Sequence, residues 1–283
     1  MRRGLSLLEL LVVISVSSLM LGLVLTGVQY ARAVARRNSC QNNLRQIGLA
    51  LHQYEASYKC LPMGRGNMGH SPLVSILPQI GQVSLFQQLD LSKDVDGNPI
   101  AMITRVKEFR CPDTPDGNPS QTDYVLNRGT TLSDLRDSPW FYEERLRPTF
   151  SMFERGLTNT AIYSETSPPT KSGNTRQFGL PERTIKNQYE SSIFEKECSD
   201  LPGSGPTSTL TNGEFWFGAG TANYYHIFTP NQRSCTNGGL LQSSLFSSLS
   251  LHSNGANVLY ADARVDFVGS NMDSLAWRAI GAR

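Results

Sequence analysis

Hydrophobic residues near the N-terminus follow two successive patterns. From Leu10 to Ala31 the chain carries no charged residue. A helix of that length, at about 1.5 Å per residue, covers about 33 Å, which is enough to cross the hydrocarbon core of a bilayer. Farther on, apolar residues recur at every third or fourth position, which is typical of one helix face; they are Cys40, Leu44, Ile47, Leu51, Tyr54 and Tyr58. The two patterns predict one helix over about 5–58, apolar all round at first and amphipathic afterwards.

The C-terminal part of the chain supplies a candidate partner for the amphipathic half. Residues 257–261 and 264–268 alternate in polarity around Asp262-Ala263, which predicts a β-hairpin. We expect Val258 and Tyr260 to face one way, with Val265 and Phe267 in register. A long helix packed on an antiparallel sheet, an α+β fold, is the architecture that these elements predict.

Between the helix and the hairpin the chain is rich in turns. Short helices are expected at about 82–89 and 273–280, and residues 166–213, rich in Ser, Thr, Pro, Gly and charge, indicate a long exposed insertion. Two Asp-Gly-Asn-Pro sequences, at 96–99 and 116–119, predict turns.

The first of these turns has a weaker alternative. Asp94, Asp96 and Asn98 have the alternate spacing of calcium ligands. An EF-hand loop needs a Glu at its twelfth position, where this chain has Arg105, so that pattern fails. A turn is therefore the main expectation, and a calcium-binding loop remains as the alternative.

One acidic residue, Glu9, lies inside the apolar run. A carboxylate there costs several kcal/mol unless it is paired. Residues 4–9 (GLSLLE) resemble the prepilin-type cleavage and methylation site. The resemblance implies that a prepilin peptidase cuts after Gly4 and methylates the new amine of Leu5, and that Glu9 neutralises this amine in a neighbouring subunit. The alternatives are a cleaved secretory signal, whose apolar core is ordinarily shorter, and a plain uncleaved anchor.

The orientation of the segment in the membrane does not follow from charge. Arginines precede the apolar run and also follow it, at positions 2, 3, 32, 36 and 37, so the positive-inside rule is ambiguous. The prepilin resemblance implies a cytoplasmic N-terminus and an extracytoplasmic body. The expected organisation is a leader over 1–4, a transmembrane part over 5–31, an amphipathic continuation over 32–60 and an extracytoplasmic domain over 61–283.

Composition and motifs exclude several classes of function. The net charge of +2 is too small to indicate a nucleic-acid partner. The sequence has no nucleophile elbow, phosphate loop, zinc-protease helix or dinucleotide fingerprint. We therefore expect no enzyme, no cofactor and no metal site. Of the four histidines, His252 is expected to form a structural hydrogen-bonded pair with Asp262 at the hairpin.

Five cysteines are present, and an extracytoplasmic location favours disulfides. Cys40 and Cys60 are poor partners, because most of the residues between them are helical and hold them more than about 20 Å apart. The sequence leaves the other pairings open, with Cys198–Cys235 slightly favoured.

Nearly the whole chain resembles the pilin-like family catalogued as domain of unknown function 1559, which has a prepilin-type N-terminus and an H-X9-DG motif. The matching stretches are ARAVARRNSCQNNLRQIGLALHQYEASYKCLP, ILPQIGQVSLFQQLDL, FRCPDTP, GLTNTAIYSE, FTPNQRSC and HSNGANVLYADARVDFVGSNMDSLAWRAIGAR. The resemblance implies a pilin-like fold related to type II secretion G-type pseudopilins and type IV pilins.

Two positions depart from the family pattern. His252 and Asp262 fit H-X9-D, but Ala263 replaces the glycine. Because alanine resists a positive φ, a different or wider turn is expected there. Thr26 stands where pilin-type segments often have a proline, so the helix lacks a built-in kink point.

The expected function is structural. The chain is expected to be a pseudopilin-like subunit in the inner membrane that self-associates, or associates with other pilin-like subunits, into a filament related to type II secretion or type IV pili. The alternative is a membrane-anchored surface or binding protein that uses the leader for export and does not polymerise.

Overall fold

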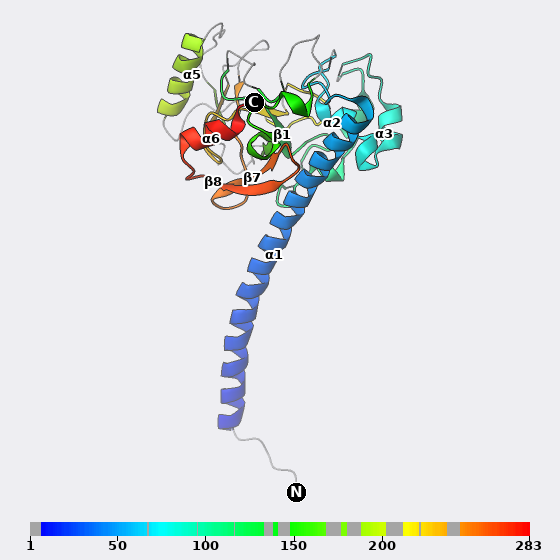
Figure 1. The fold of residues 1–283 in the computed structure, drawn as a ribbon. Helices are drawn as coiled ribbons and strands as arrows, with labels where there is room; N and C mark the ends of the chain where they lie inside the picture. The colour runs from blue at the N-terminus through cyan, green and yellow to red at the C-terminus, as the bar shows by residue number, and fades with distance from the viewer. Residues whose placement is uncertain are drawn as a thin grey trace.

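The computed structural model describes residues 7–66, 68–94, 96–115, 117–132, 138–140, 148–167, 177–179, 188–201, 212–220, 222–236 and 244–283. Helix α1, Leu7–Tyr58, has 52 residues and a length of about 78 Å. Its N-terminal half projects from the rest of the molecule (Figure 1). Within the described residues it is the one helix long and apolar enough to cross a membrane.

The C-terminal half of α1 packs on the body along the predicted stripe as far as Tyr54, whereas Tyr58 is exposed. Its buried residues are Cys40, Leu44, Ile47, Gly48, Ala50 and Leu51. The helix ends where Lys59 takes a positive φ of 58° and its N–H donates to the Glu55 carbonyl at 2.7 Å, which satisfies one of the orphan carbonyls of the last turn. A single continuous helix therefore joins the projecting segment to the core.

A five-stranded sheet forms the centre of the body, in the order β4-β1-β2-β7-β8. The strands are β1 (Tyr124–Asn127), β2 (Ala161–Glu165), β4 (Asn223–Tyr224), β7 (Gly255–Tyr260) and β8 (Val265–Gly269). The pairs β1–β2, β2–β7 and β7–β8 are antiparallel. The edge strand β4 pairs with β1 in parallel. The expected sheet is thus confirmed as mostly antiparallel, with one parallel edge strand that makes it mixed.

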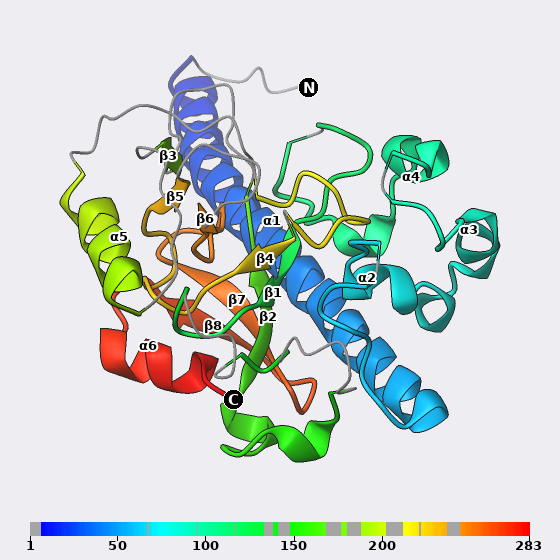
Figure 2. The same cartoon turned by 90° about the horizontal axis from the view of Figure 1, so that it is seen from above.

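The sheet lies between two helices (Figure 2). On the α1 side, Leu44, Ile47 and Leu51 belong to one apolar cluster with Tyr163 and Leu259 of the sheet. Helix α6, Ser274–Gly281, covers the other side. There Trp277 is fully buried, in a cluster with Val125, Tyr224, Val258 and Tyr260. Successive side chains of β7 therefore point into two different apolar clusters, as expected for a sheet covered on both faces.

The C-terminal hairpin forms as predicted, but in a different register. Val265 pairs with Leu259 and Phe267 with Asn257, so they do not share a face with Val258 and Tyr260. The turn is wider than a two-residue turn, as expected from Ala263. The Tyr260 N–H donates to the Arg264 carbonyl and the Ala263 N–H to the Tyr260 carbonyl, so residues 261–263 form the loop.

The residue that stands in place of the family's glycine takes the glycine conformation. Ala263 has a φ of 66°, so the alanine adopts the positive φ that it resists, within the wider turn that was expected there. A three-residue hairpin loop requires a left-handed residue at its end, and the closed hydrogen bonds of the loop outweigh the roughly 1–2 kcal/mol that this conformation costs a residue with a Cβ.

The predicted exposed insertion contains ordered structure. Helix α5 (Gln188–Asp200) packs near a small sheet of β3 (Gln177–Gly179), β5 (Ser234–Thr236) and β6 (Ser244–Leu245). Phe194 and Cys198 of α5 are fully buried. The compositional prediction of an exposed loop is therefore wrong for α5. A 13-residue helix can be polar on one face and still bury an aromatic residue and a disulfide on the other.

Short helices connect the remaining segments: α2 (Pro72–Ser75), α3 (Val83–Gln88), α4 (Pro99–Ile103) and the 3-10 turns Pro78–Ile80, Lys107–Phe109, Phe150–Met152 and Leu157–Asn159. The predicted helices at 82–89 and 273–280 correspond to α3 and α6. Asp116 of the second predicted turn lies outside the described residues.

The loop considered for calcium is closed by its own amide. The Asn98 side chain donates to the carbonyls of Asp90 and Asp94 and accepts from the Asp90 N–H. The Asp94 carboxylate accepts from the Gly97 N–H at 3.1 Å. These bonds use the side-chain amide oxygen of Asn98 and one carboxylate oxygen of Asp94. They support the interpretation of this segment as a turn.

Candidate functional site

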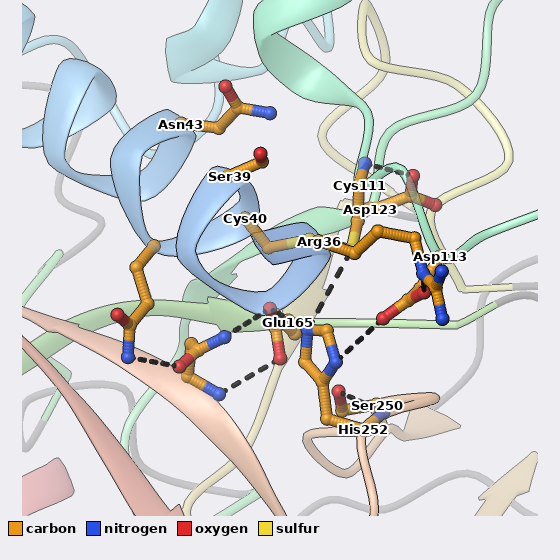
Figure 3. A network of polar contacts seen from close by, with 12 residues as sticks. Arg36, Ser39, Cys40, Asn43, Cys111, Asp113, Asp123, Glu165, Ser250 and His252 are labelled. Atoms are coloured by element: carbon orange, nitrogen blue, oxygen red, sulfur yellow. Dashed lines mark hydrogen bonds and ion pairs between the residues drawn. A yellow bond between two sulfur atoms is a disulfide. The ribbon is translucent and has the colours of Figure 1, made fainter. Parts of the chain in front are cut away.

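A buried polar cluster lies where α1 meets the sheet (Figure 3). Cys40 comes from α1, Cys111 follows the 3-10 turn Lys107–Phe109, Glu165 ends β2, and His252 precedes β7. Exposed fractions are 0% for Cys40, 6% for Cys111, 2% for Glu165 and 8% for His252. Four segments far apart in the sequence therefore bring sulfur, carboxylate and imidazole groups into one site shielded from solvent.

A disulfide joins Cys40 to Cys111, with a Cα–Cα distance of 5.0 Å. Asp123 fixes the backbone on the Cys111 side: its carboxylate accepts from the Cys111 N–H at 2.7 Å and from Arg110 Nε at 2.9 Å. Burial raises the pKa of Asp123, against the opposing effects of the Arg110 charge and of these hydrogen bonds. The bridge attaches the long helix covalently to the body.

His252 lies between two carboxylates. Its Nδ1 is 2.9 Å from Asp113 Oδ2, and its Nε2 is 3.3 Å from Glu165 Oε1 and 3.8 Å from Cys111 Sγ. Arg36 of α1 pairs with the same Asp113. Burial opposes the charged form of the ring, but the hydrogen bond to Glu165 and the charges of Glu165 and Asp113 outweigh it and raise the pKa of His252.

Glu165 is oriented by a single asparagine. The Asn257 N–H donates to Glu165 Oε2 at 2.9 Å, and Asn257 Nδ2 donates to Glu165 Oε1 at 2.7 Å. Gln41 of α1 in turn donates to Asn257 Oδ1 at 3.0 Å. Because both Glu165 oxygens accept fixed donors, the carboxylate is preorganised, and its orientation does not depend on solvent.

The expected His252–Asp262 pair is wrong. The two residues flank β7, and a strand of six residues is about 20 Å long, so they lie at its opposite ends. His252 contacts Asp113 and Glu165 instead. Asp262 lies in the hairpin loop, where it accepts from the Arg264 N–H at 3.0 Å. The H-X9-D spacing thus marks the two ends of one strand, and only its histidine belongs to the cluster.

The other predicted site residues lie elsewhere. Glu9 is in the projecting part of α1 (Figure 1), remote from the cluster, and Gly4 and Leu5 lie outside the described residues. The structure joins Cys198 to Cys235, the pairing that the sequence favoured. Cys60 is buried and belongs to neither disulfide.

Sequence reasoning missed Cys40, Cys111, Asp113 and Glu165 as members of one site. Local patterns carry no information on which distant segments meet. One signal was present, however: four stretches that carry the family resemblance each contribute to the cluster, namely NSCQNN, FRCPDTP, TAIYSE and HSNGAN.

Comparison with known proteins gives a family without an assigned activity. No curated protein and no solved structure matches the chain. Residues 29–275 match the family described as "Protein of unknown function (DUF1559)", a range that holds the amphipathic half of α1, the sheet and every residue of the cluster. The chain is therefore a member of the DUF1559 family.

Proposed function

We propose that this protein is a membrane-anchored, pilin-like structural subunit that assembles through the apolar half of α1. The observation that carries the proposal is the division of that helix: its buried residues begin only at Cys40. The exposed large apolar residues of the preceding part include Leu7, Leu11, Val16, Leu21 and Leu25. Such a surface is unfavourable in water and suited to hydrocarbon or to like helices.

The resemblance of residues 4–9 to a prepilin site extends the proposal. A prepilin peptidase would cleave after Gly4 and methylate Leu5, and the body would lie outside the cytoplasm with the N-terminus inside. Two disulfides in the body fit an oxidising exterior. Glu9 would neutralise the terminal amine of a neighbouring subunit within the apolar bundle, which gives a carboxylate in hydrocarbon a physical reason to be there.

Crosslinking tests assembly against simple anchoring. A Tyr30→Cys variant, with Cys60→Ser to remove the one cysteine outside the disulfides, leaves both disulfides in place and puts a reactive thiol on an exposed position of α1. Oxidation of membranes should give crosslinked oligomers. Adding Glu9→Leu should leave membrane insertion intact and reduce the oligomers sharply, because the neighbouring amine loses its countercharge.

The matched control is Glu55→Leu, on the same helix but beyond the apolar part, which should leave crosslinking unchanged. Equal oligomers with and without Glu9→Leu would contradict assembly through Glu9 and favour the alternative, a surface or binding protein that is anchored and does not polymerise. Mass spectrometry of the mature protein tests processing separately: an intact Met1 would contradict cleavage after Gly4.

A further inference from the structure

The cluster at the α1–sheet junction has the donor atoms of a metal site. One sulfur each from Cys40 and Cys111, a carboxylate oxygen of Glu165 and a ring nitrogen of His252 all lie within 4.8 Å of one another. Two thiolates, one imidazole and one carboxylate are ligands that zinc accepts in tetrahedral geometry. In the oxidised protein the two sulfurs are bonded to each other, so this donor set becomes available only when the bridge is in its dithiol form.

The surroundings of the cluster resemble the outer shell of a metal centre. Asp113 lies 2.9 Å from His252 Nδ1, which favours the proton on that nitrogen and directs Nε2 toward Cys111 and Glu165. A carboxylate behind a ligating histidine is a common device for fixing its tautomer and orientation. Asn257 holds Glu165 from behind in the same way. A plain disulfide between two elements needs none of these groups.

We propose that the dithiol form of Cys40 and Cys111 binds one zinc-class divalent cation, with His252 Nε2 and Glu165 completing a tetrahedral site. Binding converts two thiols and one cation into two metal–thiolate bonds and releases two protons, plus the Nε2 proton of His252 when the ring is protonated, with no change in oxidation state. Disulfide formation from the same thiols removes two protons and two electrons and needs an oxidant. An exported chain arrives with its cysteines reduced, so the cation and the disulfide are alternative ways to fasten α1 to the body.

The burial and the donor atoms of the cluster favour a cation that gives up its water shell and prefers sulfur and nitrogen ligands. Cys40 is fully buried and Glu165 nearly so, so a cation there would exchange its water shell for the protein ligands. Thiolate and imidazole donors select zinc-like ions over calcium or magnesium, which prefer oxygen ligands. This inference does not depend on polymerisation, since the site lies in the body and uses only the amphipathic half of α1.

Cobalt(II) is the probe, because its spectrum reports thiolate ligation and tetrahedral geometry. The full-length protein with Cys60→Ser, in detergent, is titrated with Co²⁺ before and after treatment with a phosphine. The phosphine takes the oxygen of a water molecule, and the disulfide gains the two electrons and two protons as thiols. The reduced protein should bind one equivalent with thiolate-to-cobalt charge transfer and intense visible bands, and Zn²⁺ should displace them. The oxidised protein should show neither.

Paired variants separate this site from the other cysteines. Cys40→Ser with Cys111→Ser should abolish the charge-transfer band, whereas Cys198→Ser with Cys235→Ser should retain it. If the first pair does not fold, as judged by circular dichroism, His252→Gln serves instead, with His70→Gln as its control. His70 donates to the Lys93 carbonyl, away from the cluster. Asp113→Asn should weaken binding by about 10- to 100-fold without removing the band.

Three results would overturn the proposal. They are a reduced protein without a charge-transfer band, a band that survives loss of Cys40 and Cys111, and an affinity that His252→Gln leaves unchanged. Each would show that the histidine and the two carboxylates serve only as a structural ion-pair network around the disulfide.

Discussion

The two halves of α1 belong to one continuous helix but differ in how their apolar side chains are arranged and covered. In the projecting half, Leu19 and Leu25 are 68% and 62% exposed, whereas in the packed half Leu44 and Leu51 are fully buried. Both halves are rich in apolar residues. They differ in arrangement, since the projecting half is apolar all round and the packed half is apolar on one face. Apolar content therefore shows which half suits hydrocarbon, and periodicity shows which half suits a sheet.

Polar side chains make the same contrast. In the projecting half, the hydroxyls of Ser15 and Thr26 donate to carbonyls of their own helix, at Val12 and Leu23. That is the economical arrangement where the surroundings offer no partner. In the packed half, Ser39 and Ser57 keep the same bond within the helix, but three larger polar side chains reach the body. Asn43 donates to the Arg110 carbonyl, Gln41 donates to Asn257 Oδ1, and His52 contacts the Ala261 carbonyl.

Truncating a leucine in each half gives the largest expected effect. Leu51→Ala should lower the free energy of unfolding of the body by about 2–5 kcal/mol, because it leaves a cavity against the sheet. Leu21→Ala should change it by less than about 0.5 kcal/mol, because Leu21 is exposed. Denaturant titration in detergent, followed by the fluorescence of the tryptophans, all of which lie in the body, measures both. An equal cost would show that the two halves are not independent.

Acidification should act on the body from the side opposite α1. His226 is fully buried and stacks on Trp277 with ring centroids 3.9 Å apart. Its Nδ1 donates to the Trp277 carbonyl, and its Nε2 accepts from the Tyr224 hydroxyl at 2.6 Å. Burial lowers the pKa of His226 to about 3, with the Trp277 carbonyl opposing the shift. The folded protein thus holds this ring neutral.

The sign of the effect follows from the lowered pKa. A histidine in the unfolded chain has a pKa of about 6.5. The contribution of neutral His226 to the stability of the fold is therefore fully present above that pH and is lost as the pH falls toward about 3. At pH 5 the loss should be about 2 kcal/mol. His252, whose pKa is raised, acts in the opposite direction. The measurement is therefore the difference between the pH profiles of the parent protein and of His226→Phe, and identical slopes would contradict it.

Local patterns predicted the elements of this fold and little of how they meet. The stripe from Cys40 to Tyr58 and the alternation before and after Asp262 each involve neighbours in sequence, so 3.6- and 2-residue periods reveal them. The Cys40–Cys111 bridge joins residues 71 positions apart, and the cluster adds Glu165 and His252. Which segments meet depends on sheet order, and no periodicity encodes that order.

Errors at the hairpin have a different origin. The His252–Asp262 pair was inferred from a shared motif, although a strand separates the two residues. At Ala263 the wider turn agrees with expectation, but the hydrogen bonds of the loop also hold the alanine at a positive φ, against its own conformational preference. Both cases show that contacts made in the folded protein determine the local structure, even against a local preference of about 1 kcal/mol.

The smallest expected effect concerns the contact between Gly48 and Ala263. A Cβ on Gly48 would lie 2.9 Å from Leu259 Cδ1, 3.0 Å from Ala263 Cβ and 3.1 Å from Ala263 Cα, so the glycine lets the hairpin loop approach the helix. Ala263→Gly relieves the positive φ but removes a buried methyl group and frees the unfolded chain. These terms are each about 1 kcal/mol, and the net change in stability should be within about 1 kcal/mol of zero.

A double-mutant cycle isolates this contact from the opposing terms. Gly48→Ala alone gains helix propensity and introduces the clash. In the Ala263→Gly background the methyl at 3.0 Å is gone and the end of the Leu259 side chain can rotate away, so the 3.1 Å contact with the Cα of residue 263 is the close contact that remains. The double variant should therefore be more stable than the sum of the single changes by about 0.5–1 kcal/mol. Gly27→Ala, in the projecting half where an added Cβ meets nothing within 4 Å, should show no coupling to Ala263→Gly. Denaturant midpoints of the four proteins of each cycle measure both couplings. If the Gly48 cycle closes without coupling, the Ala263 methyl does not limit how closely the packed half of α1 approaches the sheet.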